Sequence, residues 1–151
     1  DADLGRSGDF DLRMEARSRS RMLRRLQDLS AVVERCQTMA ARWQELIPSE
    51  AARRPIEPIG SKTVYARYPL FVERKDALLT AARRLRVELA GWYGSVVHPL
   101  TDRQYSLVGY EPGLCPNAER AAAEIVSLPT NVMVRDPYTS RVGSMFREVC
   151  G

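Results

Sequence analysis

The chain has 151 residues, a length that suits one domain with an ordinary hydrophobic core. Hydrophobic residues form 44% of the chain and charged residues 28%, which excludes disordered, collagen-like and low-complexity proteins. The net charge is only +4, because 19 acidic residues offset 23 basic ones, so no broad basic face is expected.

The apolar stretches are too short to cross a membrane. The longest uncharged one, residues 89–97, contains two glycines and a serine, whereas a membrane helix needs about 20 apolar residues. Residues 1–12 lack the basic and apolar regions of a secretory signal. We therefore expect a cytoplasmic protein with no membrane partner.

A regular pattern of apolar residues predicts a long helix in the first third of the chain. From Met22 to Ile47 these residues are spaced alternately by four and three positions. A period of 3.5 keeps them on one side of a helix, as in a coiled coil. We expect the helix to begin between residues 12 and 15 and to end at Pro48. Its apolar seam consists of Met22, Leu26, Leu29, Val33, Cys36, Ala40, Trp43 and Ile47.

The rest of the chain alternates between short strand and helix patterns. β-Branched and aromatic residues predict a strand over residues 63–72, with brief strands at 87–89 and 131–134. Helical spacing predicts helices over 77–86, 117–127 and 140–149. The expected fold class is therefore α/β: a long N-terminal helix and a small sheet of about three strands, with helices on one face.

Between these elements, residues 91–113 predict an irregular surface loop rich in glycine, proline and aromatic residues, of the kind that carries function on a rigid scaffold. The loop holds the single histidine of the chain, His98, close to Trp92 and Tyr93. Such a histidine either hydrogen-bonds the loop to itself or contacts a ligand. Polar groups among aromatic rings would suit a sugar or a nucleotide.

Several classes of site are excluded because their residues are missing. The sequence has no glycine-rich phosphate loop, and one histidine cannot build a catalytic triad or a histidine-rich metal site. Three cysteines at long, unequal spacings suggest neither a disulfide framework nor a zinc site. The two lysines, Lys62 and Lys75, stand beside charged or polar neighbours, so we expect surface lysines whose pKa nothing lowers.

Two stretches of the chain resemble a known family. GWYGSVVHPL (91–100), followed by GYEPGLCPNAERAAAEIVSLPT (109–130), is similar to the C-terminal region of the DegT/DnrJ/EryC1/StrS sugar aminotransferases. These are fold-type I enzymes that use pyridoxal phosphate (PLP). Upstream, FDLRM (10–14) and the leucines after it resemble the family's aromatic-Asn-aromatic-Arg-Met segment and its long interdomain helix. The resemblance covers nearly the whole chain and implies the α+β small domain of these enzymes.

This resemblance implies roles for five residues. Arg13 matches the motif arginine, in a segment that reaches across a dimer to the neighbour's cofactor phosphate or substrate. Asp11 stands where many members have asparagine, and since a carboxylate repels phosphate, it would orient Arg13. These two are the candidate cofactor-binding residues. Tyr93 and His98 match the loop at the sugar-nucleotide entrance, and with Trp92 they are the candidate substrate-binding residues.

The resemblance also implies a division of the chain and a missing part. Residues 1–50 would form the cross-dimer segment and interdomain helix, and residues 51–151 the C-terminal small domain. In the family, the lysine that binds PLP and the aspartate that pairs with its pyridine nitrogen lie upstream of FDLRM. Without them the chain cannot hold the cofactor.

We therefore expect the C-terminal part of an aminotransferase, as a fragment or a split subunit that has no catalytic residue of its own. The complete enzyme would pass an amino group from an amino acid to a keto-sugar nucleotide. The partner of this chain would be a second copy or a separate cofactor-binding chain.

Two other functions stay open. The chain could be a non-catalytic interaction module that associates through the apolar seam; Leu29→Asp would then abolish assembly and His98→Ala would change nothing. Alternatively, the six arginines between residues 13 and 25 could bind a nucleic acid, with an affinity that falls steeply with salt. Nucleic acid is disfavoured, because no aromatic residues alternate with the arginines and nearby acidic residues offset their charge.

Overall fold

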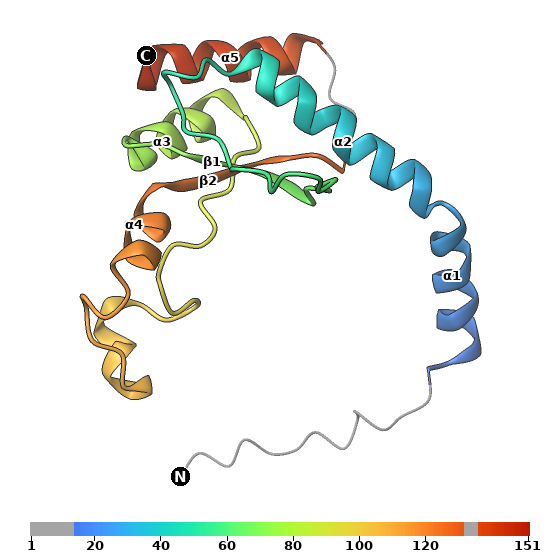
Figure 1. Ribbon diagram of the computed structural model, residues 1–151, viewed down its shortest axis with the longest axis horizontal. Helices are drawn as coiled ribbons and strands as arrows, with labels where there is room; N and C mark the ends of the chain where they lie inside the picture. The colour runs from blue at the N-terminus through green and yellow to red at the C-terminus, as the bar shows by residue number, and fades with distance from the viewer. Residues whose placement is uncertain (1–13, 132–135) are drawn as a thin grey trace. The chain divides into compact units, whose positions relative to one another are not determined.

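The computed structural model describes residues 14–131 and 136–151 (Figure 1). The chain divides into two compact units, residues 1–32 and 33–151. The described elements, in chain order, are α1 (Ala16–Gln27), α2 (Leu29–Leu46), β1 (Arg67–Phe71), α3 (Lys75–Leu85), the 3-10 helix η2 (Asp102–Val108), α4 (Pro116–Glu124), β2 (Ile125–Pro129) and α5 (Asp136–Cys150). None of the described helices is long and apolar enough to cross a membrane.

The N-terminal helix is divided in two at Asp28. This residue follows the end of α1 with φ −87° and ψ 2°, outside ordinary helical geometry. The second helix, α2, begins one residue later and ends at Leu46, two residues before Pro48. The expectation of one continuous helix is therefore wrong, whereas its end just before Pro48 is confirmed.

The apolar seam is buried from Cys36 onward, half-buried at Val33 and exposed from Met22 to Leu29. Trp43 and Ile47 are almost completely buried, and Cys36 is buried with them. Met22 and Leu26, in contrast, are more than half exposed. The second half of the seam thus belongs to the core of residues 33–151, and it is not a surface for association.

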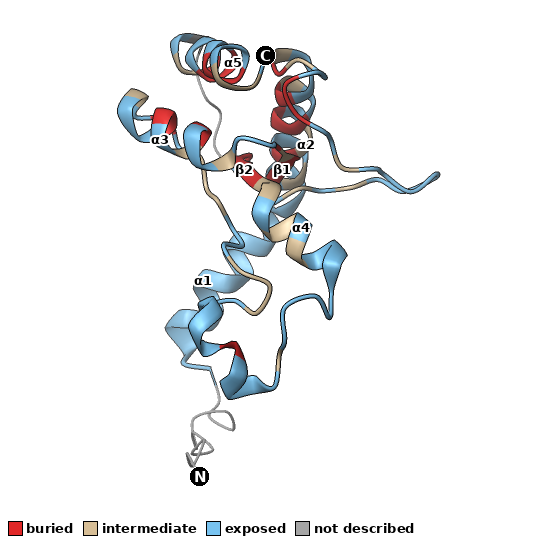
Figure 2. Cartoon of the chain, turned by 90° about the vertical axis from the view of Figure 1, so that its left-hand side faces the viewer, coloured by how far each residue is buried: buried red, intermediate tan, exposed pale blue. Residues whose placement is uncertain are grey.

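The sheet has two antiparallel strands. Tyr68 in β1 is paired with Leu128 in β2, and Leu70 with Val126, and all four side chains are buried. Figures 1 and 2 show α2, α3 and α5 on one side of the strands and α4 on the other. In the part of the chain that the structure describes, the expectation of about three strands is therefore wrong.

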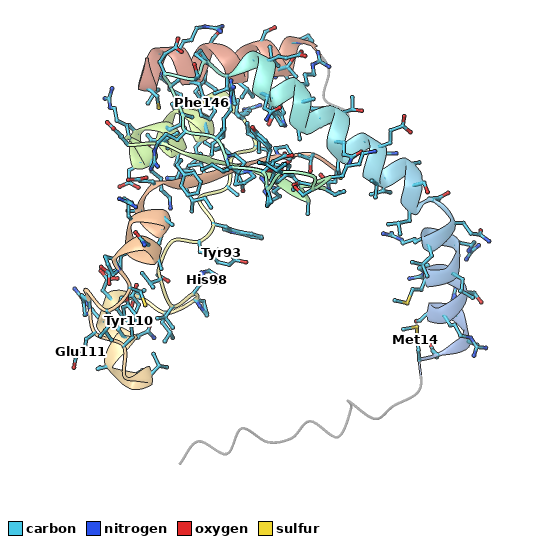
Figure 3. The ribbon with its side chains drawn as sticks, in the orientation of Figure 1. Met14, Tyr93, His98, Tyr110, Glu111 and Phe146 are labelled. Atoms are coloured by element: carbon cyan, nitrogen blue, oxygen red, sulfur yellow. The ribbon has the colours of Figure 1, made fainter. Side chains whose placement is uncertain are left out.

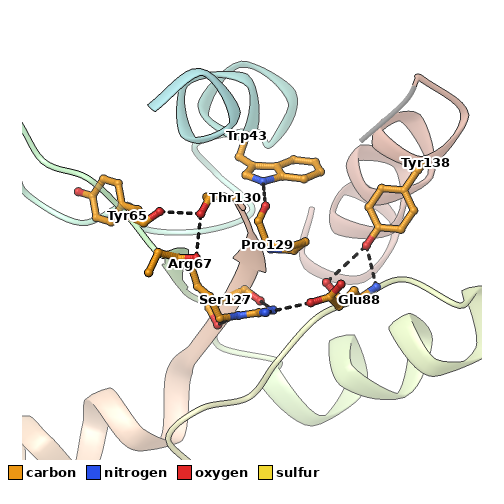
Figure 4. Close-up of polar contacts among 9 residues, drawn as sticks. Trp43, Tyr65, Arg67, Glu88, Ser127, Pro129, Thr130 and Tyr138 are labelled. Atoms are coloured by element: carbon orange, nitrogen blue, oxygen red, sulfur yellow. Dashed lines mark hydrogen bonds and ion pairs between the residues drawn. The ribbon is translucent and has the colours of Figure 1, made fainter. Parts of the chain in front are cut away.

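The segment expected as the strand 87–89 is held by side chains instead of a strand ladder (Figure 4). The Glu88 backbone N–H donates a hydrogen bond to the Tyr138 hydroxyl at 2.7 Å. The Glu88 carboxylate pairs with Arg67 at 2.9 Å. Strand-like backbone bonds form just after this segment, at Ala90, which exchanges two backbone hydrogen bonds with Ser127. The other expected strand, 131–134, lies outside the described residues except for its first position.

The last three residues of the helix predicted over 117–127 belong instead to the second strand, β2. The helix α4 ends at Glu124, and Ile125 is already extended, with φ −71° and ψ 131°. Val126 and Leu128 then become fully buried against β1. Pairing with a strand more than 50 residues away overrides the local helical pattern at this point.

The core of residues 33–151 is centred on Trp43. Its indole N–H donates a buried hydrogen bond to the Pro129 carbonyl at 2.9 Å, which joins α2 to the end of β2. Met39 and Phe146, both fully buried, belong to the same cluster. A Cβ at Gly143 would lie 3.2 Å from the Leu46 carbonyl oxygen, so the lack of a side chain lets α5 pass close to the end of α2.

This core predicts different effects for the two tryptophans. Trp43→Phe leaves the Pro129 carbonyl unpaired and creates a small cavity, so we expect the free energy of unfolding to fall by about 3 kcal/mol. Trp92→Phe, at an exposed position, should change it by less than about 0.5 kcal/mol. Urea denaturation followed by circular dichroism measures both. Equal losses for the two variants would contradict the central role of Trp43.

Candidate functional site

The loop expected over residues 91–113 follows directly from the sheet. Ala90 is bonded to Ser127 of β2, and the chain then leaves the sheet at Gly91. Within the loop, the Thr101 N–H and hydroxyl both donate to the Gln104 side-chain oxygen at 3.0 Å, which begins η2. Gly109, with φ 68°, ends this short helix. The T-x-x-Q pattern is a helix-start signal that is readable in the sequence.

An open recess of about 750 Å³ lies in this loop. Trp92, 63% exposed, and His98 both line it. Asp102 and Arg103 contribute a carboxylate and a guanidinium group from η2. An aromatic face beside groups that can donate and accept hydrogen bonds suits a ligand with a flat or sugar ring and polar substituents.

The third candidate, Tyr93, supports the histidine and is not part of the recess lining. The Tyr93 and His98 ring centroids are 5.1 Å apart, with an angle of 65° between the ring planes (Figure 3). This is the edge-to-face arrangement that aromatic rings favour. In the described part of the chain the imidazole makes this ring contact and no hydrogen bond to the loop. The structure therefore places Trp92 and His98 in the recess lining, and Tyr93 in contact with His98.

A hydrogen-bonded pair, Tyr110 and Glu119, joins the end of the loop to α4. The Tyr110 hydroxyl donates to the Glu119 carboxylate at 2.5 Å, and the Gly113 N–H donates to the same oxygen at 2.6 Å. The Tyr105 ring meets the Tyr110 ring edge-on, and the Tyr105 hydroxyl accepts a hydrogen bond from the Val96 N–H. Sequence analysis missed this pair, because residues nine positions apart share no helix face or strand register.

The hydrogen bond between these two side chains shifts both of their pKa values. It is the main reason that the pKa of Tyr110 rises to about 12 and that the pKa of Glu119 falls below its usual 4.5. A carboxylate that accepts hydrogen bonds is favoured in its charged form, while the tyrosine proton is retained.

Comparison with known proteins supports the resemblance found in the motifs. The sequence profile of the DegT/DnrJ/EryC1/StrS aminotransferase family matches residues 6–147. The chain belongs to this family. No curated protein sequence matches it.

Two solved aminotransferase structures have a fold similar to that of the chain. A DegT/DnrJ/EryC1/StrS aminotransferase from Brucella abortus matches 92% of the chain with a TM-score of 0.76 and 21% identity. DesV from S. venezuelae, solved with a ketimine intermediate, matches 90% with a TM-score of 0.78 and 23% identity. The chain corresponds to 36% of the length of each of these proteins.

The structure does not test the candidate cofactor-binding residues of this family member. Arg13 and Asp11, the candidate cofactor-binding residues, lie outside the described part of the chain, so their roles stay predictions. Lys62 is exposed. The Lys75 amine donates to the Ala122 carbonyl at 2.6 Å, so it is held by backbone. The described residues also contain no group of three or more histidine, cysteine or acidic side chains that could hold a metal ion.

Lys75 also differs from the surface lysine that the sequence predicts. It is half-buried, and the loss of hydration lowers its pKa from 10.5, although Asp76 partly opposes this shift. The expectation that nothing would lower its pKa is therefore wrong. The burial arises because the chain between α3 and α4 folds back over the start of α3, which no local pattern shows.

The pair of Tyr110 and Glu119 gives a pH prediction. Because folding raises the pKa of Tyr110 and lowers that of Glu119, their contribution to stability is complete between about pH 4.5 and pH 10. It is lost as the pH rises from 10 through 12 and as it falls below 4.5.

We expect Glu119→Gln to return the pKa of Tyr110 from about 12 toward 10, because the charged acceptor is gone. The ¹³Cζ shift of the labelled tyrosines, followed against pH, measures this change, and Tyr110→Phe assigns the signal. Glu111→Gln is the matched control, since this neighbouring carboxylate is exposed. If Tyr110 titrates at about 12 in Glu119→Gln as well, the hydrogen bond is not the cause.

Proposed function

We propose that this chain is the C-terminal part of a PLP-dependent aminotransferase that acts on keto-sugar nucleotides. In this proposal the chain supplies the substrate recess, while the lysine and aspartate that hold PLP belong to a part of the enzyme outside this sequence. The observation that carries the proposal is the recess, where Trp92 and His98 stand together in a chain of this family. Alone, the chain would not catalyse transamination.

The groups in the recess suit the parts of a sugar nucleotide. The exposed Trp92 indole offers a face on which a sugar or base can stack. Arg103 offers a guanidinium group, whose planar set of donors matches phosphate oxygens. His98 and Asp102 can hydrogen-bond hydroxyl groups. In this proposal Tyr93 acts through His98, by holding the imidazole ring in place.

The proposal extends to the partner and the cofactor segment. Residues 1–50 would reach across a dimer, with Arg13 near the neighbour's cofactor phosphate or substrate and Asp11 orienting Arg13. The partner would be a second copy or a separate cofactor-binding chain, and an amino acid would serve as the amino donor. We place this assembly in the cytoplasm, and residues 51–151 would act as its small domain.

A binding experiment tests the recess. We expect the chain to bind UDP-glucose or dTDP-glucose weakly, and His98→Ala to weaken that binding about tenfold, as the loss of one hydrogen bond to a charged group would. Saturation-transfer difference NMR detects such weak binding. Thr38→Ala, an exposed change on α2, is the control and should bind as the parent chain does. Equal binding by His98→Ala and the parent would remove His98 from the site.

A second candidate function is supported by the exposed part of the apolar seam. Met22 and Leu26 in α1 and Leu29 at the start of α2 are each more than half exposed, as is Leu23 beside them. Contiguous apolar side chains on a helix favour association with another apolar surface. The alternative is therefore a non-catalytic module that associates through these residues. Trp43 takes no part in it, because it is buried in the core.

The two candidates differ in the effect of a charge on the seam. If the seam drives self-association, Leu29→Asp should convert an oligomer to a monomer, because it places a carboxylate in the apolar contact. Ser30→Asp adds the same charge one position away, off the seam, and should leave assembly unchanged. Sedimentation velocity at several concentrations distinguishes the species. A parent chain that stays monomeric at high concentration would exclude self-association through the seam.

A further inference from the structure

Lys75 connects three parts of the chain near the recess. It is the first residue of α3, and its amine donates to the carbonyl of Ala122 in α4 at 2.6 Å. The same amine lies 3.4 Å from the carbonyl oxygen of Tyr93, a long contact with the loop. One side chain therefore links the start of α3 and the end of α4 to the aromatic part of the loop.

The position of this amine is explained by the carbonyl groups around it and not by its own helix. An ammonium group at a helix N-terminus is opposed by the helix dipole, and half-burial costs it hydration. Both costs are offset at the C-terminal end of α4, where the last carbonyls lack partners within the helix and carry partial negative charge. The Ala122 carbonyl is one of these groups.

The stem of Lys75 is also packed against the loop. A Cβ at Gly91 would lie 3.2 Å from Lys75 Cε and 2.8 Å from Leu79 Cδ1, so the loop backbone passes directly over these side chains. Gly91 and Trp92 both line the recess. The stem thus meets the loop one residue before Trp92, and the amine meets it one residue after.

The start of the loop is also tied to the sheet, by the pairing of Ala90 with Ser127. That pairing fixes the backbone just before Gly91. The Tyr93 ring in turn packs on His98. A contact that holds the Tyr93 backbone therefore affects the positions of both recess residues. Trp92 is its neighbour in the chain, and His98 packs against its ring.

We propose that Lys75 is a positioning residue for the recess: it holds the Tyr93 backbone against the end of α4 and thereby fixes where Trp92 and His98 stand. This inference rests on the proposed function only in assuming that the recess binds a ligand. The placement of the loop by Lys75 can be measured without any ligand.

The two tryptophans make that measurement possible in the full chain. In a ¹⁵N-labelled sample, the indole N–H of Trp43 reports on the core and that of Trp92 reports on the recess. We expect Lys75→Met, which keeps an unbranched stem but removes the charge, to shift or broaden the Trp92 signal and leave the Trp43 signal unchanged. Lys75→Arg, which restores a cation, should recover part of the parent Trp92 signal.

Lys62→Met is the matched control, because it removes the other lysine of the chain from an exposed position. It should leave both indole signals unchanged. In saturation-transfer difference NMR with UDP-glucose, Lys75→Met should bind about tenfold more weakly than the parent chain, and Lys62→Met equally well. If Lys75→Met does not fold, Lys75→Gln is the second variant, with the same expectations.

The outcomes separate the two proposals. An unchanged Trp92 signal in Lys75→Met overturns the positioning role. A shift of both indole signals also overturns it, since Lys75 would then support the whole domain and not the loop. A shift of Trp92 alone, in a chain whose parent form binds neither UDP-glucose nor dTDP-glucose, supports the positioning role and contradicts the proposed function.

Discussion

The hydrogen bond from the Trp43 indole to the Pro129 carbonyl is the contact on which the rest of the fold depends. It is buried, so neither group has water as an alternative partner, and it joins α2 to the end of β2. The strand held in this way pairs with β1 on one side and with Ala90 on the other. Through Ala90, the core sets the point from which the recess loop leaves the sheet.

Past that point the loop is held by side chains and by one short helix. Lys75 meets it near Tyr93, the Tyr105 hydroxyl accepts from Val96, and the pair of Tyr110 and Glu119 joins its far end to α4. Each of these contacts is made by a polar side chain and not by a strand ladder. The arrangement leaves Trp92 exposed in the recess, which suits a side chain that contacts a ligand.

The chain belongs to the aminotransferase family, but it spans only 36% of the length of each solved relative. A recess with an indole, an imidazole and a guanidinium group can bind and orient a substrate. The half-buried amine near this recess, that of Lys75, is held by a helix carbonyl. Under the proposed function, substrate binding and cofactor chemistry belong to different parts of the complete enzyme.

The sequence by itself determined the features that depend on local patterns: most of the helices, the end of α2 just before Pro48, the irregular loop, and the family through its motifs. Tertiary structure alone decided which half of the apolar seam is buried, because burial depends on what packs against a helix and not on its periodicity. It also decided that Ile125–Pro129 forms β2 and that Lys75 holds the loop. Both depend on partners far away in the chain: β1 lies more than 50 residues from β2, and the Ala122 carbonyl lies 47 residues from Lys75. No spacing rule within a helix or strand records such pairs.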